Sequence, residues 1–449
     1  MSTLLCLGRH TLTGWLTTSG QQFADWTAAY RLFSADRLPV PEIFSVIRRN
    51  VLAQLPTSAP LAVALDDTLL RKRGTHIPGV AWRRDPLGPP FQTNFVRAQR
   101  VLPFSAALPL SPNAYRMVPI GFHHAPTPPK PSRKASDQQR QHYRQQARRM
   151  RLSLQAAHQI AALRQALDAE PDGAQRPLRL FVDGGYTNAT VLKKLPARTT
   201  LIGRIRKDAK LYTLPPPSPT PQRGRPRRYG APASTPEQVR TNDAMPWRSL
   251  EISINGVAHS LRVKGVPDLL WRTAGLQHTL QLVVIAPLGY RLRKGSRLLY
   301  KRPAFLICTD PQLDLHSLVQ GYIQRWDIEV NFREEKTLLG VGQAQVRHKQ
   351  SVEDVPALQV ASYALLLLAT RQAFPQSASP GLLPRPKWAN AASNVRFSTA
   401  RAIHQLRAEV WGHALGLRNF SGFADHLAAN TKPEKFPSDP SSALFYATN

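Results

Sequence analysis

Cysteine is scarce in this sequence, since only Cys6 and Cys308 occur among 449 residues. The two stand far apart, and neither has partners at the spacing of zinc ligands. The sequence therefore offers neither a disulfide framework nor a structural zinc site. Two free thiols are typical of a reducing compartment, and we expect a cytoplasmic protein.

Long apolar segments are also missing. The most apolar run, PALQVASYALLLLA at 356–369, is shorter than the ~20 residues that a membrane-spanning helix needs. Asp354 and Arg371 flank it, so we expect a buried helix of a core. The N-terminus lacks a basic region followed by an apolar stretch and a cleavage site, which predicts no secretory signal. We expect no membrane partner.

Acidic residues are few, with 28 Asp and Glu against 60 Lys and Arg, a formal net charge of +32. This balance favours a polyanionic partner, and DNA, taken here as double-stranded, or RNA comes ahead of an acidic membrane surface. Ribosomal and histone-like proteins share such an excess but are usually short. This chain is long enough for two or three domains with a real core. We therefore expect a DNA-binding, nucleoid-associated protein.

The pattern along the chain divides it into five parts. Residues 1–58 are helical in pattern and are expected to form an N-terminal DNA-binding domain. Residues 59–207 alternate between strand and helix, as a layered α/β domain does. Residues 208–310 begin with a basic, low-complexity stretch and are otherwise β-rich, so they are interpreted as an insertion. Residues 311–375 hold two long helical patterns that complete the α/β domain, and 376–449 form a Pro- and Ser-rich tail.

Three local patterns are more specific. Ser136 and Gln139 have the spacing of a capping box, which predicts the start of one long basic helix running to about residue 167. The Asn255-Gly256 pair lies between alternating residues and predicts a β-hairpin. The segment 316–340 is expected to be one continuous helix.

Within that last helix, a rotation of about 100° per residue gathers one carboxylate and several cations on one face. One interpretation, which we call the bland interpretation, is that these residues only form ordinary i,i+4 ion pairs on the helix surface. The other is a carboxylate that holds a metal ion beside cations that hold a DNA backbone. The residues on this face are Tyr322, Arg325, Glu329, Arg333 and Lys336. Because Glu329 is the one carboxylate among them, metal binding would need further acidic residues from elsewhere in the chain.

Candidate partners follow two apolar runs. LAVALDDT ends in Asp66 and Asp67, and FVDGGY places Asp183 in the same way. A carboxylate at the end of a buried strand is costly unless it is paired or bound to a metal. Gly184 and Gly185 would allow backbone or substrate to come close. Strand-end Asp residues that merely cap turns are the alternative.

The spacing Tyr322-x2-Arg325-x3-Glu329-x6-Lys336 resembles the signature of DDE transposases of bacterial insertion sequences. The Asp-x-Thr and Asp-Gly-Gly-Tyr motifs resemble the two acidic regions of that family and occur in the same order. The resemblance runs from about Leu61 to Lys336. It implies an α/β fold of the RNase H-like type, with a mixed five-stranded sheet, flanking helices and an interrupting β-rich insertion.

The same resemblance implies that Asp66, Asp183 and Glu329 form a catalytic triad that binds Mg²⁺ or Mn²⁺. Asp66 is preferred to Asp67 because the Asp-x-Thr register fits it, and strand alternation places Thr68 on the face of Asp66.

Predicted DNA contacts lie in two places. RGRPRRYG resembles a minor-groove hook through Arg225 and Arg227, with a solvated basic linker as the alternative. The other contacts follow from the family signature, with Arg333 added from the same helix face: Tyr322, Arg325, Arg333 and Lys336.

The implied chemistry is in-line attack on a phosphodiester, with two metal ions about 3.5–4 Å apart. The predicted protein is a cut-and-paste transposase that acts as a homodimer on two DNA ends. Two alternatives stay open: a catalytically idle DNA-binding regulator derived from such an element, and an RNase H-like nuclease without strand transfer.

Overall fold

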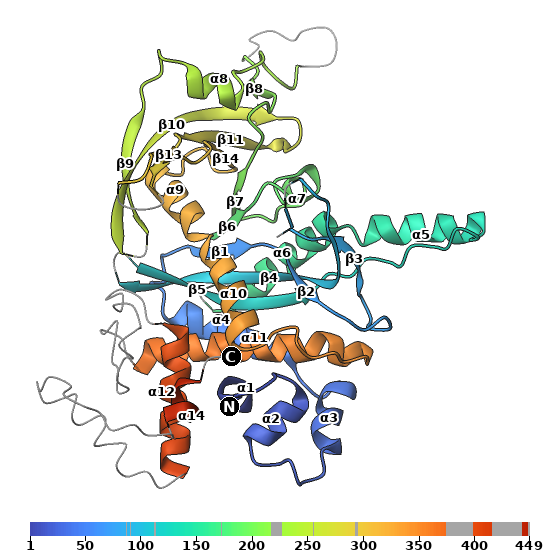
Figure 1. The fold of residues 1–449 in the computed structure, drawn as a ribbon. Coiled ribbons are helices and arrows are strands. Elements are labelled where there is room, and N and C mark those ends of the chain that lie inside the picture. Colours follow the sequence, from blue (N-terminus) through green and yellow to red (C-terminus); the bar gives the residue numbers. More distant parts are fainter. Residues whose placement is uncertain are drawn as a thin grey trace, which may run out of the picture.

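One mixed sheet with helices on both faces organises the chain (Figure 1). The structure is a computed structural model. It describes residues 1–449 apart from 87, 90, 112–113, 172, 217–226, 255, 292–294, 374–397, 415–441 and 448–449.

Five strands form the centre of the sheet. Their order is β5–β4–β1–β6–β7, in which β1, β6 and β7 run parallel and β4 is antiparallel to both β1 and β5. β1 is apolar throughout and almost wholly buried, as a strand covered on both faces requires. The bounds are β1 Leu61–Leu65, β4 Phe95–Ser111, β5 Ala114–His124, β6 Leu178–Val182 and β7 Thr199–Arg204.

Two short strands continue this centre on the side of the first acidic pair. β2, Thr68–Arg71, follows β1 along one side of β4, and β3, Ala81–Arg84, lies along the other side. The Asp66-Asp67 pair stands between β1 and β2, so the apolar run ends where its interpretation as a strand predicted.

The β-rich segment extends the same sheet beyond β7. β14 pairs with β7, and β11, β10 and β8 follow in order. Ile254 pairs with Val257, which confirms the predicted hairpin, and Gly256 has a φ of +79° that suits its tight turn. The elements here are β8 Leu211–Thr213, α8 Pro236–Thr241, β9 Arg248–Ile254, β10 Val257–Trp271, β11 Gly275–Ile285, β12 Gly289–Tyr290, β13 Leu299–Tyr300 and β14 Ala304–Cys308.

Two of the N-terminal helices, α1 and α4, contribute to the core of the sheet, whereas α2 and α3 pack with α11 (Lys349–Ala373) in a separate apolar cluster. Phe44, Ile47 and Val51 of α4 are buried in the largest apolar cluster, together with residues of β1 and β4. The elements within residues 1–58 are helices, and α4 packs on the central layer. The DNA-binding role of this region stays a prediction. The bounds are α1 Ser2–Leu5, α2 Leu12–Thr18, α3 Thr27–Ser34 and α4 Val40–Ala53.

The remaining helices cover the sheet or lie beside it. Ile328 and Phe332 of α10 pack on Ala64 and Met117, so α10 covers the face that carries Ala64. Figure 1 shows α9 and α10 in front of the sheet and α6 behind it. The bounds are α6 Leu152–Asp168, α7 Ala189–Leu192, α9 Leu315–Gln324, α10 Asp327–Leu338, α11 Lys349–Ala373, α12 Thr399–Ala414 and α14 Ser442–Tyr446.

α11 is the described helix that is long and apolar enough, by length and composition, to cross a membrane, yet 72% of its most apolar window is buried. It packs against β5, α3 and α4. The expectation of a buried helix over 356–369 is confirmed.

The predicted long basic helix is two helices. Ser136 accepts from the Gln139 amide and Gln139 caps in return, which confirms the capping box at the start of α5, Asp137–Arg149. The chain then turns at Met150 and Arg151, and α6 begins at Leu152. The composition explains the break: α5 buries no side chain, whereas α6 buries a series of apolar ones in the core.

The expected single helix over 316–340 is also wrong, because α9 ends at Gln324 and α10 begins at Asp327. Two tertiary contacts hold the turn between them. Arg325 reaches Asp66 at 3.0 Å, and the Asp327 carboxylate accepts a hydrogen bond from the Met117 amide at 3.2 Å. Helical periodicity in the sequence does not reveal such tertiary contacts, which override the local pattern.

Candidate active site

Two carboxylates meet at one edge of the sheet. β1 and β6 pair in parallel with Leu65 opposite Val182, so the next residues, Asp66 and Asp183, emerge side by side. Burial raises the pKa of Asp66 to about 6; Arg325 opposes this shift and the Asp183 charge adds to it. Two acids in electrostatic contact at a buried strand end favour a cation between them.

The neighbouring acid is held differently. Asp67 accepts a hydrogen bond from the Tyr186 hydroxyl at 2.7 Å and pairs with Arg100 at 3.2 Å. Asp66 instead faces Asp183 and Arg325. Asp67 is therefore engaged in bonds between elements, while Asp66 belongs to the group of acids.

The turn after β6 fixes Asp183. Its Oδ1 accepts from the amides of Gly185, at 2.8 Å, and Tyr186, at 3.3 Å. A Cβ atom at Gly185 would lie 3.1 Å from that oxygen, which is tighter than most real contacts. Glycine thus lets the backbone close around the carboxylate.

Glu329 comes from the first turn of α10 and faces the same acids. Burial raises its pKa, Arg325 opposes the shift, and Asp183 adds to it. Arg325 bridges the site, with Nη1 3.0 Å from Asp66 Oδ2 and Nη2 3.8 Å from Glu329 Oε1. The i,i+4 pair of the bland interpretation is thus present, and so is a contact with the first acid that the sequence did not indicate.

The other signature residues lie around this centre. Lys336 donates to the Thr68 hydroxyl at 2.6 Å, on the same face as Asp66. The Arg325 guanidinium stacks on the Tyr322 ring, 5.6 Å from its centroid. Arg333 is exposed.

Only one of the two arginines of the predicted minor-groove hook lies in the described part of the chain. Arg227 is exposed, and Arg225 falls outside the described residues.

A cleft of about 1860 Å³ opens over the acids. Its lining carries nine Lys and Arg against five Asp and Glu, and it includes Asp66, Asp183 and Glu329. Trp82 and Phe95, which are 68% and 56% exposed, lie on the same lining. This wall was not predicted from the sequence, although alternation along β3 and β4 places four cationic and aromatic side chains on one face: Trp82, Arg84, Phe95 and Arg97.

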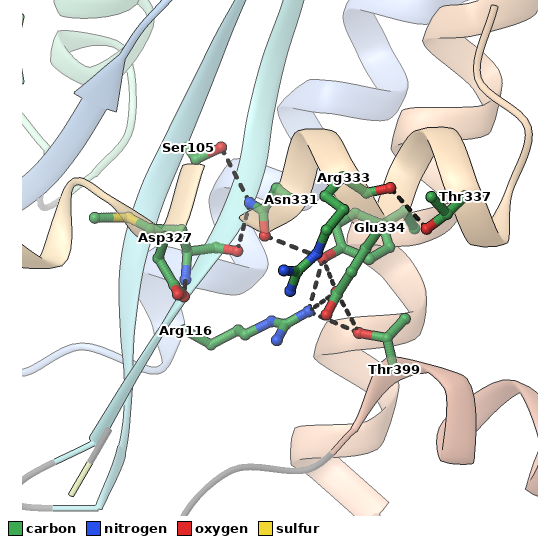
Figure 2. A network of polar contacts seen from close by, with 10 residues as sticks. Ser105, Arg116, Asp327, Asn331, Arg333, Glu334, Thr337 and Thr399 are labelled. Carbon is green, nitrogen blue, oxygen red and sulfur yellow. Dashed lines mark hydrogen bonds and ion pairs between the residues drawn. The ribbon is translucent and has the colours of Figure 1, made fainter. Parts of the chain in front are cut away.

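A buried polar network fixes α10 from behind (Figure 2). The Glu334 carboxylate contacts the Arg116 guanidinium and accepts from Tyr363 at 2.7 Å and Thr399 at 2.6 Å. Asn331 donates to the Met117 carbonyl at 2.9 Å. These bonds join α10 to β5, α11 and the start of α12, so Glu329 sits on a helix that is held at several points.

α10 thus has two polar faces with the same spacing of four and three residues. We call Asp327, Asn331 and Glu334 the buried triplet after its fully buried member Asn331, the two acids being half-buried. The cleft triplet is Glu329, Arg333 and Lys336.

The donor set suits a hard divalent cation, since its members are carboxylates and the charge of Asp183 raises the pKa of both Asp66 and Glu329. In the described part of the chain, however, no three His, Cys, Asp or Glu side chains lie close enough to share one ion. Arg325 stands between two of the acids, since its guanidinium contacts both Asp66 and Glu329.

A family model described as DDE superfamily endonuclease matches residues 1–256, more than half of the chain. The matched segment holds Asp66 and Asp183, and Glu329 lies beyond it. A search of curated proteins gave no match.

Proposed function

Because this chain belongs to the DDE superfamily endonucleases, a family whose substrate is DNA, we propose that it is a transposase that cuts and joins DNA at the ends of an insertion sequence. The carrying observation is the position of Asp66 and Asp183 at neighbouring parallel strand ends, opposite Glu329, in one basic cleft. The order β5–β4–β1–β6–β7 supports an RNase H-like core beneath them.

The cations of the cleft are suited to hold a DNA backbone. Three of them line the cleft and are proposed to contact phosphates: Arg97, Arg333 and Lys336. Their positive charges would neutralise the phosphates of the DNA strand that lies beside the acids. Tyr322 and Arg325 are proposed to contact phosphates as well. For Arg325 this requires a change of partner, from the carboxylates of Asp66 and Glu329 to the incoming phosphate.

Asp66, Asp183 and Glu329 would hold the divalent ions that this superfamily generally uses, and we propose Mg²⁺ or Mn²⁺. Bound ions would supply an activated attacking oxygen and stabilise the leaving one. The protein's own part is to bring the carboxylates together and position the phosphate between them. Two DNA ends must meet for transposition, which favours a homodimer acting in the cytoplasm on the nucleoid.

Two other functions are favoured by specific observations. A catalytically idle DNA-binding regulator would keep the basic cleft, and Arg325 would hold the acids apart permanently, as its contacts with Asp66 and Glu329 do here. An RNase H-like nuclease without strand transfer would need the same acids and no joining step.

The test is cleavage and joining of a labelled duplex that carries the flanking ends of the element, with Mg²⁺ or Ca²⁺. The native protein should cut and transfer ends with Mg²⁺, and Asp183→Asn should bind without cutting, because Asp183 adds no positive charge to the DNA contact. Binding without cutting in every reaction would favour the idle regulator. Cutting without joined product would favour the nuclease.

A further inference from the structure

A second basic surface lies outside the cleft. The segment 127–136 and helix α5 form an arm that projects from the body, as Figure 1 shows. We call residues 127–151 the basic arm. α5 has no buried residue along its length, so no apolar face attaches it to the core. A helix that is polar all round gains nothing from tertiary packing, and at 13 residues it is marginal alone.

The charges of the arm are almost all of one sign. It has one acid, Asp137, against eight cations, and no carboxylate in the described part of the chain lies within ion-pair distance of them. The cations are Lys130, Arg133, Lys134, Arg140, Arg144, Arg148, Arg149 and Arg151.

Three of these cations form a stripe along α5. Arg140, Arg144 and Arg148 follow at intervals of four residues and therefore share one face. Like charges at this spacing destabilise an isolated helix. A stripe that costs stability and covers no core is explained by a polyanionic partner.

The base of the arm is fixed to the wall of the cleft. Arg83 of β3 donates to the Thr127 hydroxyl at 3.4 Å, and Gln155 of α6 donates to the Pro126 carbonyl at 3.2 Å. The residues on either side of Arg83, Trp82 and Arg84, line the cleft. Because successive side chains of a strand point to opposite faces, the arm begins behind β3, the strand whose other face lines the cleft.

The dimensions of α5 suit a DNA groove. Thirteen residues at about 1.5 Å each make a rod ~20 Å long, and a helix about 10–12 Å wide enters the ~12 Å major groove. Gln141 and Gln145 lie beside the Arg stripe, and glutamine and arginine are the side chains that pair with adenine and guanine edges.

We propose that the basic arm binds duplex DNA that continues from the cleft, with α5 lying in the major groove and the Arg140, Arg144 and Arg148 stripe on the phosphates. This rests on the proposed function, since the duplex is the one whose strand is cut in the cleft. The arm would hold the flanking DNA, while the cleft acts on the scissile phosphate.

The experiment measures the affinity of a labelled 30-base-pair duplex as a function of salt, in the Asp183→Asn background so that the DNA stays intact. Replacing all three stripe arginines by alanine should lower the slope of log K against log salt by about three units, at ~0.9 per phosphate contact. If the two proteins bind equally at 1 M salt, the same relation predicts that affinity near 0.1 M salt falls about 500-fold. Alanine favours helix, so circular dichroism should show no loss of α5.

The matched control replaces the same three arginines by lysine, which keeps the charge and should keep most of the slope. An unchanged slope in the alanine variant, while the protein that keeps Asp183 still binds and cuts DNA, overturns the arm proposal and leaves the proposed function standing. A native protein that binds no duplex at all overturns both.

Discussion

The two polar faces of α10 carry the same spacing of side chains and meet opposite surroundings. In the buried triplet, Glu334 is matched by the Arg116 guanidinium and by two hydroxyl groups. In the cleft triplet, Glu329 is 37% exposed and shares one arginine with Asp66. One face of the helix is locked by its contacts, and the other is open.

The difference shows what separates a structural carboxylate from a candidate catalytic one. Burial alone would lower the pKa of Arg116, but Tyr363, Glu334 and Asp327 raise it above its ordinary value, so Arg116 stays charged. Around Glu329 the balance is reversed, because burial and Asp183 raise its pKa despite Arg325. The buried face is satisfied by protein groups, whereas the cleft face would gain from a cation.

Among the substitutions that test this difference between the two faces of α10, Glu329→Gln should have the largest effect. If Glu329 holds a metal ion, cleavage should fall by about 10³-fold or more, as for other essential catalytic groups. The free energy of unfolding should hardly change, since burial and Asp183 already disfavour the ionised form of Glu329. Single-turnover cleavage and urea unfolding check the two parts. Cleavage within a few-fold of native would remove Glu329 from the triad.

Glu334→Gln should give the reverse pattern. It leaves the nearly buried Arg116 guanidinium without its nearest carboxylate, which costs about 3 kcal/mol of unfolding free energy. At a temperature where the variant is folded, DNA affinity should match that of native protein, because this face does not reach the cleft. The same unfolding assay provides the measurement, with Glu329→Gln as its control. A stable Glu334→Gln would mean that the network does not anchor α10.

The sequence predicted the open face better than the locked one. Asp66 and Asp183 could be found because apolar runs stop at an acid, and parallel strands bring such ends together. The Arg116–Glu334 contact joins residues 218 positions apart, and no local sequence pattern predicts it. The turn at Arg325 was missed for the same reason, because it is held by Asp66 and Met117 from distant strands.

The capping box and the Asn-Gly hairpin were predicted correctly because each depends on residues within one turn. The break between α5 and α6 was missed because periodicity was followed across a change from polar to apolar composition. The wall of the cleft was missed because it forms only when β3 pairs with β4.

A smaller effect concerns the residue next to the buried triplet. Glu335 is 2% exposed, and burial raises its pKa to about 8, with Lys336 lowering it and Glu334 raising it. An acid with a raised folded pKa stabilises the fold at low pH, and this contribution is lost as pH rises from about 4.5 through about 8. Stability should therefore fall across that window by up to about 1.4 kcal/mol per pH unit.

Glu335→Gln removes this titration and should flatten the dependence. Urea unfolding of both proteins between about pH 5 and pH 8.5 measures the difference, which cancels contributions from other groups. Parallel curves for the two proteins would show that Glu335 does not titrate in this range. The variant would then report only a change in packing.

The smallest expected effect distinguishes two roles of Lys336 in the cleft triplet. Its amine donates to Thr68, and it also lines the cleft where a phosphate would lie. If it contacts a phosphate, Lys336→Ala should lower the salt slope of DNA binding by about one unit, equally for all sequences, and Lys336→Arg should keep it. If it serves only Thr68, Thr68→Val and Lys336→Ala should destabilise the fold alike and leave the slope unchanged. A slope that falls in Lys336→Ala but not in Thr68→Val would place Lys336 with the open face of α10.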